Sequence, residues 1–263
     1  MIMKPTLNLG PTAFTRTELI LVIFIVVLLL SLFDFGACNG DKSKAQRITC
    51  RNNLKEIGTA YRLWEDDHGG HTPAAESVSK GGWADLLTNA DQGMNCWTNY
   101  AILADDLGRS PKRVMCPADD RTAAAEFLTN AMPNDLHSQY FQNNSNLSYF
   151  VGVSANTRSP SSLLAGDRNL GGGTVPDSDY GFSPKSGEGN DVAIPITGPI
   201  SWSLKVHSAA KPAGAGNILM GDGSVQQVSS ASLNKNWLRN ATPTTNWPAG
   251  HVPATPSIRL IFP

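Results

Sequence analysis

The chain has 263 residues, a formal net charge of -1 and only 16% charged residues. Its hydrophobic content of 41% argues against intrinsic disorder, and its balanced charge argues against nucleic-acid binding. The length allows one sizeable core, while 24 glycines and 17 prolines favour a loop-rich body built from strands.

An uncharged apolar run, 19–33, begins directly after Glu18. As a helix this run is shorter than the ~30 Å hydrocarbon layer, whereas the segment counted from Phe14 has about 20 residues and is long enough to cross it. A carboxylate at the edge of a membrane needs a partner. Arg16 is not that partner, because residues two apart on a helix do not face each other. Glu18 is therefore expected to be unpaired within its own chain.

Phe14, Thr15 and Glu18, followed by a Leu/Ile/Val run, resemble the N-terminal signature of type IV prepilins and type II secretion pseudopilins. The resemblance implies that a prepilin peptidase cuts between Ala13 and Phe14, removes the leader 1–13 and methylates the new N-terminus. It also implies that Glu18 faces the N-terminal amine of a neighbouring subunit, where the two charges offset each other's desolvation. The family usually has Gly before the cut, and this chain has Ala13.

Three other interpretations of this segment stay open. A secretory signal peptide is one, although the acidic Glu18 ahead of the apolar core argues against it. A weak lipoprotein cleavage box at 35–38 is the second, with Cys38 as the lipidated residue. A simple membrane anchor is the third. Basic residues after the apolar run, such as Lys42 and Lys44, would by themselves keep the C-terminal part in the cytoplasm. The pilin resemblance implies that the C-terminal part lies on the other side of the membrane, outside the cytoplasm. Its motif is more specific than the distribution of basic residues.

A second, amphipathic helix is predicted after the apolar run. Apolar residues recur there at helical spacing and share one face that must be buried: Cys50, Leu54, Ile57, Tyr61 and Trp64. The helix is expected to end at the glycines after His68, and a bend or partial melting is expected at 36–40. By resemblance this is the pilin architecture, with a membrane half, 14–35, and an amphipathic half, 36–68.

The remaining globular domain, 69–263, is predicted to be rich in strands. Alternating apolar residues predict half-buried strands at 147–153, 200–206 and 258–262, and a glycine-containing turn predicts a hairpin at 217–228. Ser230 is expected to cap a short helix, and further helices are expected at 83–87 and 122–128. The predicted fold is α+β and pilin-like, with the long N-terminal helix packed on an antiparallel sheet with loop-rich insertions.

A second resemblance covers most of the chain. Its segments resemble a bacterial family of prepilin-like proteins whose C-terminal domain is marked by a His followed by Asp-Gly, here His207, Asp222 and Gly223. Members of that family are associated with type II secretion as proteins of the major-pseudopilin kind. This chain carries an insertion, 208–214, between the His and the Asp-Gly pair. The matching segments are 44–58, 116–119, 147–152, 164–169 and 216–225.

Metal binding is weakly indicated. Asp167 and Asp222 are candidate oxygen ligands on loops, and major pseudopilins, by resemblance, often hold a structural Ca²⁺ near the C-terminus. Neither stretch approaches an EF-hand pattern, so the favoured interpretation is that each Asp caps its own turn, and no cofactor is expected. His68 and His71 lack further ligands at zinc spacing.

The four cysteines, at positions 38, 50, 96 and 116, form no CxxC pair, which argues against a zinc ribbon. Cys50 and Cys116 are the favoured disulfide, and buried free thiols are the alternative. No motif of a serine hydrolase, a phosphate-binding loop or a zinc protease is present, so no enzyme is expected.

The sequence therefore predicts a pseudopilin, a structural subunit of a type II secretion or type IV pilus-like filament. It would cross the inner membrane once and hold its globular domain in the periplasm or at the cell surface. Its expected partners are prepilin peptidase, other pseudopilin subunits and the membrane, with no nucleic acid. The alternative is a monomeric, membrane-anchored binding domain whose loops, 69–146 and 171–199, recognise a ligand such as a polysaccharide or a secreted substrate.

Overall fold

A computed structural model describes residues 15–33, 39–86, 96–127, 140–183, 194–208, 214–238 and 258–263 of the chain. The chain divides into two compact units, Met1–Lys42 and Ser43–Pro263, and each is described by itself. Ala13, Phe14 and Cys38 lie outside the described residues, as does most of the segment in which a bend is expected.

The first unit contains helix α1, Arg16–Phe33, where the sequence predicts an apolar helix. The side chains at 19–29 are all large, apolar and exposed. Within the part of the chain that the structure describes, no helix is both long enough and apolar enough to cross a membrane.

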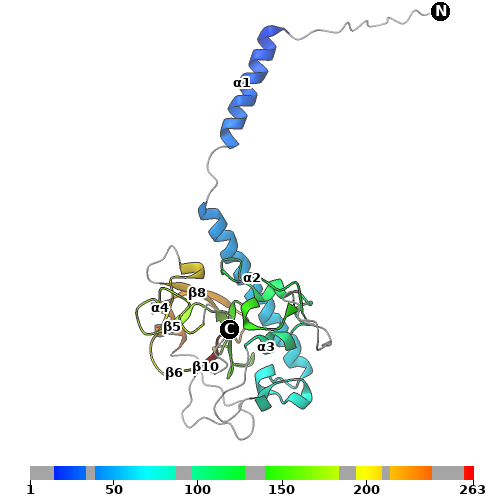
Figure 1. Cartoon of the computed structure of the whole chain (residues 1–263), viewed down its shortest axis with the longest axis vertical. Coiled ribbons are helices and arrows are strands. Elements are labelled where there is room, and N and C mark those ends of the chain that lie inside the picture. Colours follow the sequence, from blue (N-terminus) through cyan, green and yellow to red (C-terminus); the bar gives the residue numbers. More distant parts are fainter. Residues whose placement is uncertain are drawn as a thin grey trace, which may run out of the picture. The chain divides into compact units, whose positions relative to one another are not determined.

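The second unit has an α+β fold in which the long helix α2 (Asn39–Asp67), which belongs to this unit from Ser43 on, packs on a six-stranded antiparallel sheet (Figure 1). The predicted apolar face of this helix is confirmed, because the five residues from Cys50 to Trp64 that define it are each at most 5% exposed. Burial of that face contributes to holding the helix on the sheet.

Helix α2 ends at Asp67, where the sequence predicts its end. Gly69 and Gly70 follow with φ angles of 64° and 83°, which glycine adopts without the steric cost that other residues meet. Gly58, in the middle of the helix, allows close approach to the sheet, because a Cβ added there would lie 2.9 Å from Leu219 Cδ1.

The six strands lie in the order β6-β10-β3-β4-β8-β9, and each neighbouring pair is antiparallel. The predicted hairpin is present as β8 and β9, and Gly223 in its turn has a φ angle of 78°. The strands predicted at 147–153 and 258–262 are present as β3 and β10. The strands are β3 (Tyr149–Gly152), β4 (Leu163–Asp167), β6 (Ile194–Ile196), β8 (Ala215–Met220), β9 (Val225–Ser229) and β10 (Ile258–Ile261).

The central strands β3, β4 and β8 are buried on both faces, so the expectation of a half-buried strand at 147–153 is wrong, whereas β6, β9 and the start of β10 are partly exposed. On one face, Tyr149 and Val151 of β3 pack in the same cluster as α2. On the other face, Phe150 packs in a second cluster with Trp202. This second cluster also includes residues of the small sheet of β5 (Leu170–Gly172) with β7 (Ile200–Trp202) and of the short helix η7 (Leu233–Trp237). The short helix α4 (Ser230–Ser232) lies between β9 and η7 in the chain. The large sheet is therefore a middle layer.

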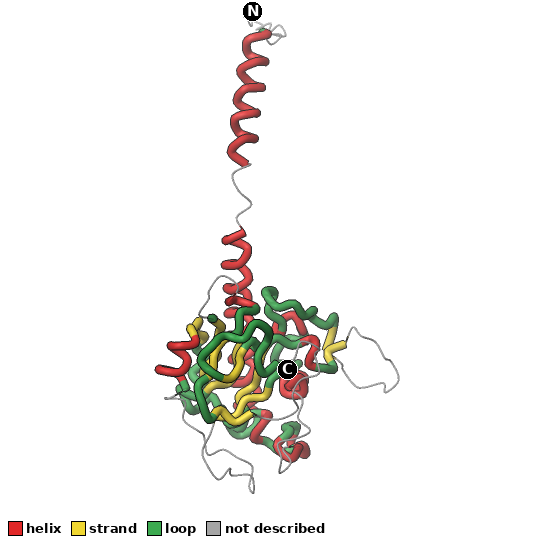
Figure 2. The backbone as a smooth tube through the Cα atoms, turned by 60° about the vertical axis from the view of Figure 1, so that its left-hand side comes forward, coloured by secondary structure: helices red, strands yellow, loops and turns green. Residues whose placement is uncertain are grey.

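Loops and short helices connect these layers, as Figure 2 shows in green and red. The predicted helix at 122–128 is wrong: β1 (Glu126–Phe127) pairs there in parallel with β2 (Tyr140–Phe141), because Phe127 packs against Phe141 in the core. The other short helices are η1 (Pro73–Ala75), η2 (Val78–Lys80), η3 (Ala84–Leu86), α3 (Cys96–Ile102), η4 (Pro111–Val114), η5 (Asn144–Asn146) and η6 (Val206–Ser208).

Two other local predictions need correction. The strand expected at 200–206 stops at Trp202, and η6 begins at Val206. The cap of helix α4 is Ser229 rather than Ser230, since the Ser229 hydroxyl accepts a hydrogen bond from the Ser232 N–H at 3.3 Å. Ser230 instead accepts a hydrogen bond from the Trp202 N–H at 2.9 Å, which ties the helix to β7.

Candidate functional site

Glu18 is paired within its own chain, contrary to the expectation from the sequence. Its Oε2 atom accepts hydrogen bonds from the N–H of Thr15 at 2.8 Å and from the Thr15 hydroxyl at 2.9 Å. In return, the Glu18 N–H donates to the Thr15 hydroxyl at 3.3 Å. This is a capping box, which satisfies N–H groups that the first turn of a helix leaves without partners. The carboxylate remains exposed, so it can also meet a group from outside the chain.

The apolar surface of α1 lies directly behind this acid. Leu19, Ile20 and Phe24 are 57%, 65% and 64% exposed. Because consecutive residues are apolar, the exposed surface extends around the whole helix rather than along one stripe. Helices that are apolar all round occur where protein or lipid surrounds them.

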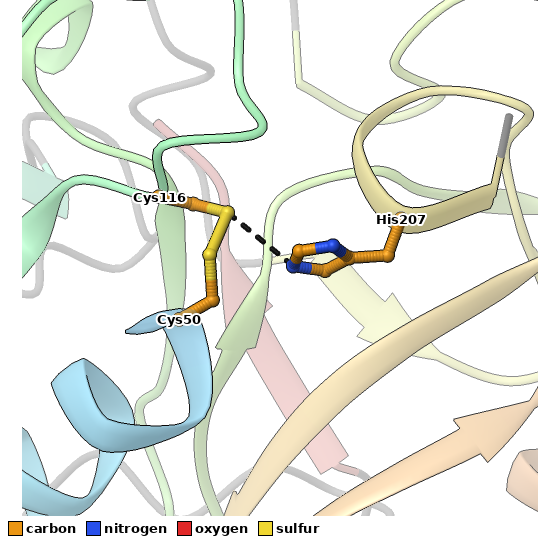
Figure 3. A group of neighbouring side chains, drawn as sticks. All are labelled: Cys50, Cys116 and His207. Atoms are coloured by element: carbon orange, nitrogen blue, oxygen red, sulfur yellow. Dashed lines mark hydrogen bonds between the residues drawn. A yellow bond between two sulfur atoms is a disulfide. The ribbon is translucent and has the colours of Figure 1, made fainter. Parts of the chain in front are cut away.

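A disulfide joins Cys50 of α2 to Cys116, which follows η4, with the two Cα atoms 5.1 Å apart. This is the pair that the sequence favours. His207 of η6 points at the disulfide, and its Nε2 atom lies 3.3 Å from Cys116 Sγ (Figure 3). All three side chains are buried. Three segments far apart in the sequence therefore meet at one enclosed point.

The segments that carry these residues are fastened to α2. The amide of Asn53 donates a hydrogen bond to the Met115 carbonyl at 2.7 Å, and the guanidinium of Arg47 donates to the His207 carbonyl at 3.1 Å. Val206, directly before His207, has a φ angle of 57°, a conformation that costs a residue with a side chain about 1–2 kcal/mol. The surrounding contacts hold His207 in place against that cost.

Asp167 lies beside His207, with its Oδ2 atom 3.8 Å from His207 Nε2. It is a fully buried residue of β4 rather than a loop residue, and it does not cap its own turn. Instead its Oδ2 atom accepts hydrogen bonds from the backbone N–H and the side-chain amide of Asn217 at 2.7 and 2.9 Å. Burial raises the pKa of Asp167 to about 7, because it disfavours the carboxylate more than the Asn217 bonds favour it.

Asp222, the second candidate calcium ligand, is an exposed residue of the β8–β9 turn. Its Oδ1 atom accepts a hydrogen bond from the Ser224 N–H at 2.8 Å, which is the turn-capping role that the sequence favours. The register of β4 and β8 pairs Leu163 with Met220 and Gly166 with Ile218, so Asp167 and Asp222 lie at opposite ends of this strand pair. They cannot share one ion.

The same register separates the residues of the family motif. His207 lies beside Asp167 and the disulfide, whereas Asp222 and Gly223 form the turn at the other end of β8. There, Arg62 of α2 donates a hydrogen bond to the Asp222 carbonyl. The three motif residues therefore contribute to two different places on the sheet, each in contact with α2.

A further cluster of charges, which no motif of the sequence predicts, joins Asp119 and Asp120, shortly after Cys116, to Arg168, directly after Asp167. The Arg168 guanidinium contacts the Asp119 carboxylate through two hydrogen bonds, at 2.7 and 2.8 Å, and Asp120 through a third at 2.9 Å. The ring of Tyr180 stacks under the guanidinium, 3.5 Å from centroid to Cζ. Both Arg168 and Asp119 side chains have no exposed area. Burial alone would raise the pKa of Asp119, but the guanidinium outweighs it and holds the pKa below its ordinary value.

The two histidines of the His-Gly-Gly-His segment do not converge on a metal. His68 stacks on Trp64 at 3.6 Å between ring centroids, and His71 pairs with Glu76 at 2.9 Å. Among the described residues, the group with metal-ligating atoms in mutual reach is Cys50, Cys116 and His207. Comparisons with protein-family models, with curated proteins and with solved structures found no match to this chain.

Proposed function

We propose that this chain is a pilin-like structural subunit, a pseudopilin of a type II secretion or type IV pilus-like filament. In this proposal prepilin peptidase cuts between Ala13 and Phe14, and the segment 14–35 holds the subunit in the inner membrane until assembly. The globular domain then lies in the periplasm or at the cell surface.

The observation that carries this proposal is the exposed apolar surface of α1 directly behind Glu18. Such a surface is unfavourable in water by about 25 cal/mol per Å², so lipid, or the same helix of other subunits, has to cover it. A carboxylate in the first turn of that helix is suited to pair with a cationic group of another subunit. Such charge complementarity fixes how neighbouring helices align with each other.

Two features of the second unit support the proposal. A long helix packed on an antiparallel sheet agrees with the architecture implied by the resemblance to pilins. The Cys50–Cys116 disulfide agrees with an oxidising compartment outside the cytoplasm.

Three variants separate an assembly role of Glu18 from its role in capping α1. Glu18→Ala removes the charge and the capping carboxylate, whereas Glu18→Gln removes only the charge, because Gln also serves in a capping box. Thr15→Ala removes the capping partner and keeps the charge. If Glu18 pairs with the amine of a neighbouring subunit, both Glu18 variants should form at least ~10-fold fewer multimers, and Thr15→Ala should form them normally.

The measurement is lysine-reactive cross-linking of the full chain in cell membranes, read as the fraction of chain found in multimers. This chemistry does not consume Glu18, so lost cross-links report lost assembly. If Glu18→Gln forms multimers normally, Glu18 caps the helix and its charge has no role in assembly. A wild-type chain that stays monomeric would instead favour the membrane-anchored binding domain.

A further inference from the structure

The structure points to a second state of the enclosed cluster around the disulfide. We propose that, once the disulfide is reduced, Cys50, Cys116 and His207 bind one Zn²⁺ ion together with Asp167, so that zinc and the disulfide exclude each other. This inference is independent of the proposed function.

The geometry fits zinc closely. The Sγ atoms of Cys50 and Cys116 and a ring nitrogen of His207 all lie within 4.8 Å of one another. In a tetrahedral site, with Zn–S near 2.3 Å and Zn–N near 2.0 Å, ligand atoms are about 3.3–3.8 Å apart. The distance of 3.3 Å from His207 Nε2 to Cys116 Sγ already falls in that range. After reduction the two sulfur atoms have to move apart, from bonding distance to the separation of two zinc ligands.

Asp167 is the candidate for the fourth ligand next to His207, although it lies outside the group of three whose ligand atoms are in mutual reach, so its side chain has to move towards the sulfur atoms. Its Oδ2 atom is held by Asn217 and lies 3.8 Å from His207 Nε2, while its Oδ1 atom is buried and has no hydrogen-bond partner among the described residues. A buried carboxylate oxygen without a partner is costly, and a cation beside it removes that cost. The Asn217 bonds would orient the ligand, as groups behind a metal ligand commonly do.

A dithiol or phosphine reductant delivers two electrons to the S–S bond and is itself oxidised, while the two sulfurs take up two protons and become thiols. Zinc then displaces these two protons to solvent and binds the thiolates. In the oxidised chain each sulfur is bonded to the other, so the site lacks both thiolate ligands.

The test uses the full chain in detergent, reduced with a phosphine and titrated with Zn²⁺, and with Co²⁺ as a spectroscopic probe. We expect one equivalent of Zn²⁺ bound by the reduced chain and none by the oxidised chain, with the sulfur-to-cobalt absorption of a tetrahedral thiolate site. Cys116→Ser and His207→Ala should weaken binding by about 100-fold, and Asp167→Asn by about 10-fold. The matched control is Cys96→Ser, a buried free cysteine outside the cluster, which should bind normally.

Three results would overturn the inference: no zinc bound by the reduced chain, equal binding by both redox states, or normal binding by His207→Ala. Circular dichroism covers the case in which reduction unfolds the chain. Zinc should then restore the folded spectrum in the wild type and not in His207→Ala, and a wild-type chain that stays unfolded with zinc would also contradict the proposed site.

Discussion

Replacing Asp119 by Asn should lower the free energy of unfolding by about 3–5 kcal/mol, because it leaves the Arg168 charge buried without its main partner. The Asp119 carboxylate makes two hydrogen bonds to that guanidinium, and neither side chain is exposed. The substitution keeps the shape of the side chain, so the loss reports charge rather than packing. Urea denaturation followed by tryptophan fluorescence measures it.

Asp120→Asn is the matched control. Asp120 contacts the same guanidinium, but its side chain is 46% exposed, so water screens the pair and the expected cost is at most about 1 kcal/mol. In the folded state the pKa of Asp119 lies below its ordinary value. The stability that Asp119 contributes is therefore fully present above the pKa it has in the unfolded chain, and it is lost as the pH falls through the lower pKa of the folded chain. Equal costs for the two variants would show that the buried pair does not carry this effect.

Removal of the Cys50–Cys116 disulfide should lower the free energy of unfolding by a similar amount. Its cysteines are 66 residues apart, and closing a loop of that length restricts the unfolded chain by about 4 kcal/mol. The double variant Cys50→Ser with Cys116→Ser should therefore have a free energy of unfolding that is lower by that amount. Urea denaturation with a metal chelator present measures it.

Chemical reduction is the control for the disulfide prediction. A phosphine should lower the stability of the wild type to that of the double variant and leave the double variant unchanged. A stability loss below about 1 kcal/mol in both experiments would mean that the packing of α2 on the sheet, rather than the cross-link, holds these segments together.

The features that the sequence predicts well are those with a local signal. The buried face of α2 repeats at helical spacing from Cys50 to Trp64, and the hairpin turn has its glycine at Gly223. The capping box of Thr15 and Glu18 also has a local signal, Thr-x-x-Glu, which indicates that Glu18 is paired within its own chain.

The features that the sequence does not predict depend on contacts between distant segments. Asp119 and Arg168 are 49 positions apart, and only the packing of the loop after Cys116 against β4 makes them a buried pair. Phe150 interrupts the alternation of β3, and that interruption was the available sign that the sheet is buried on both faces. The meeting of His207 with Asp167, rather than with Asp222, follows from strand register, which the sequence motif does not specify.

The most direct test of the proposed function is the intact mass of the protein purified from bacterial membranes, with its N-terminal peptide sequenced by mass spectrometry. The proposal predicts a chain that has lost residues 1–13 and begins at Phe14 with a methylated amine. A chain that still begins at Met1, or one that begins at a lipidated Cys38, would contradict it.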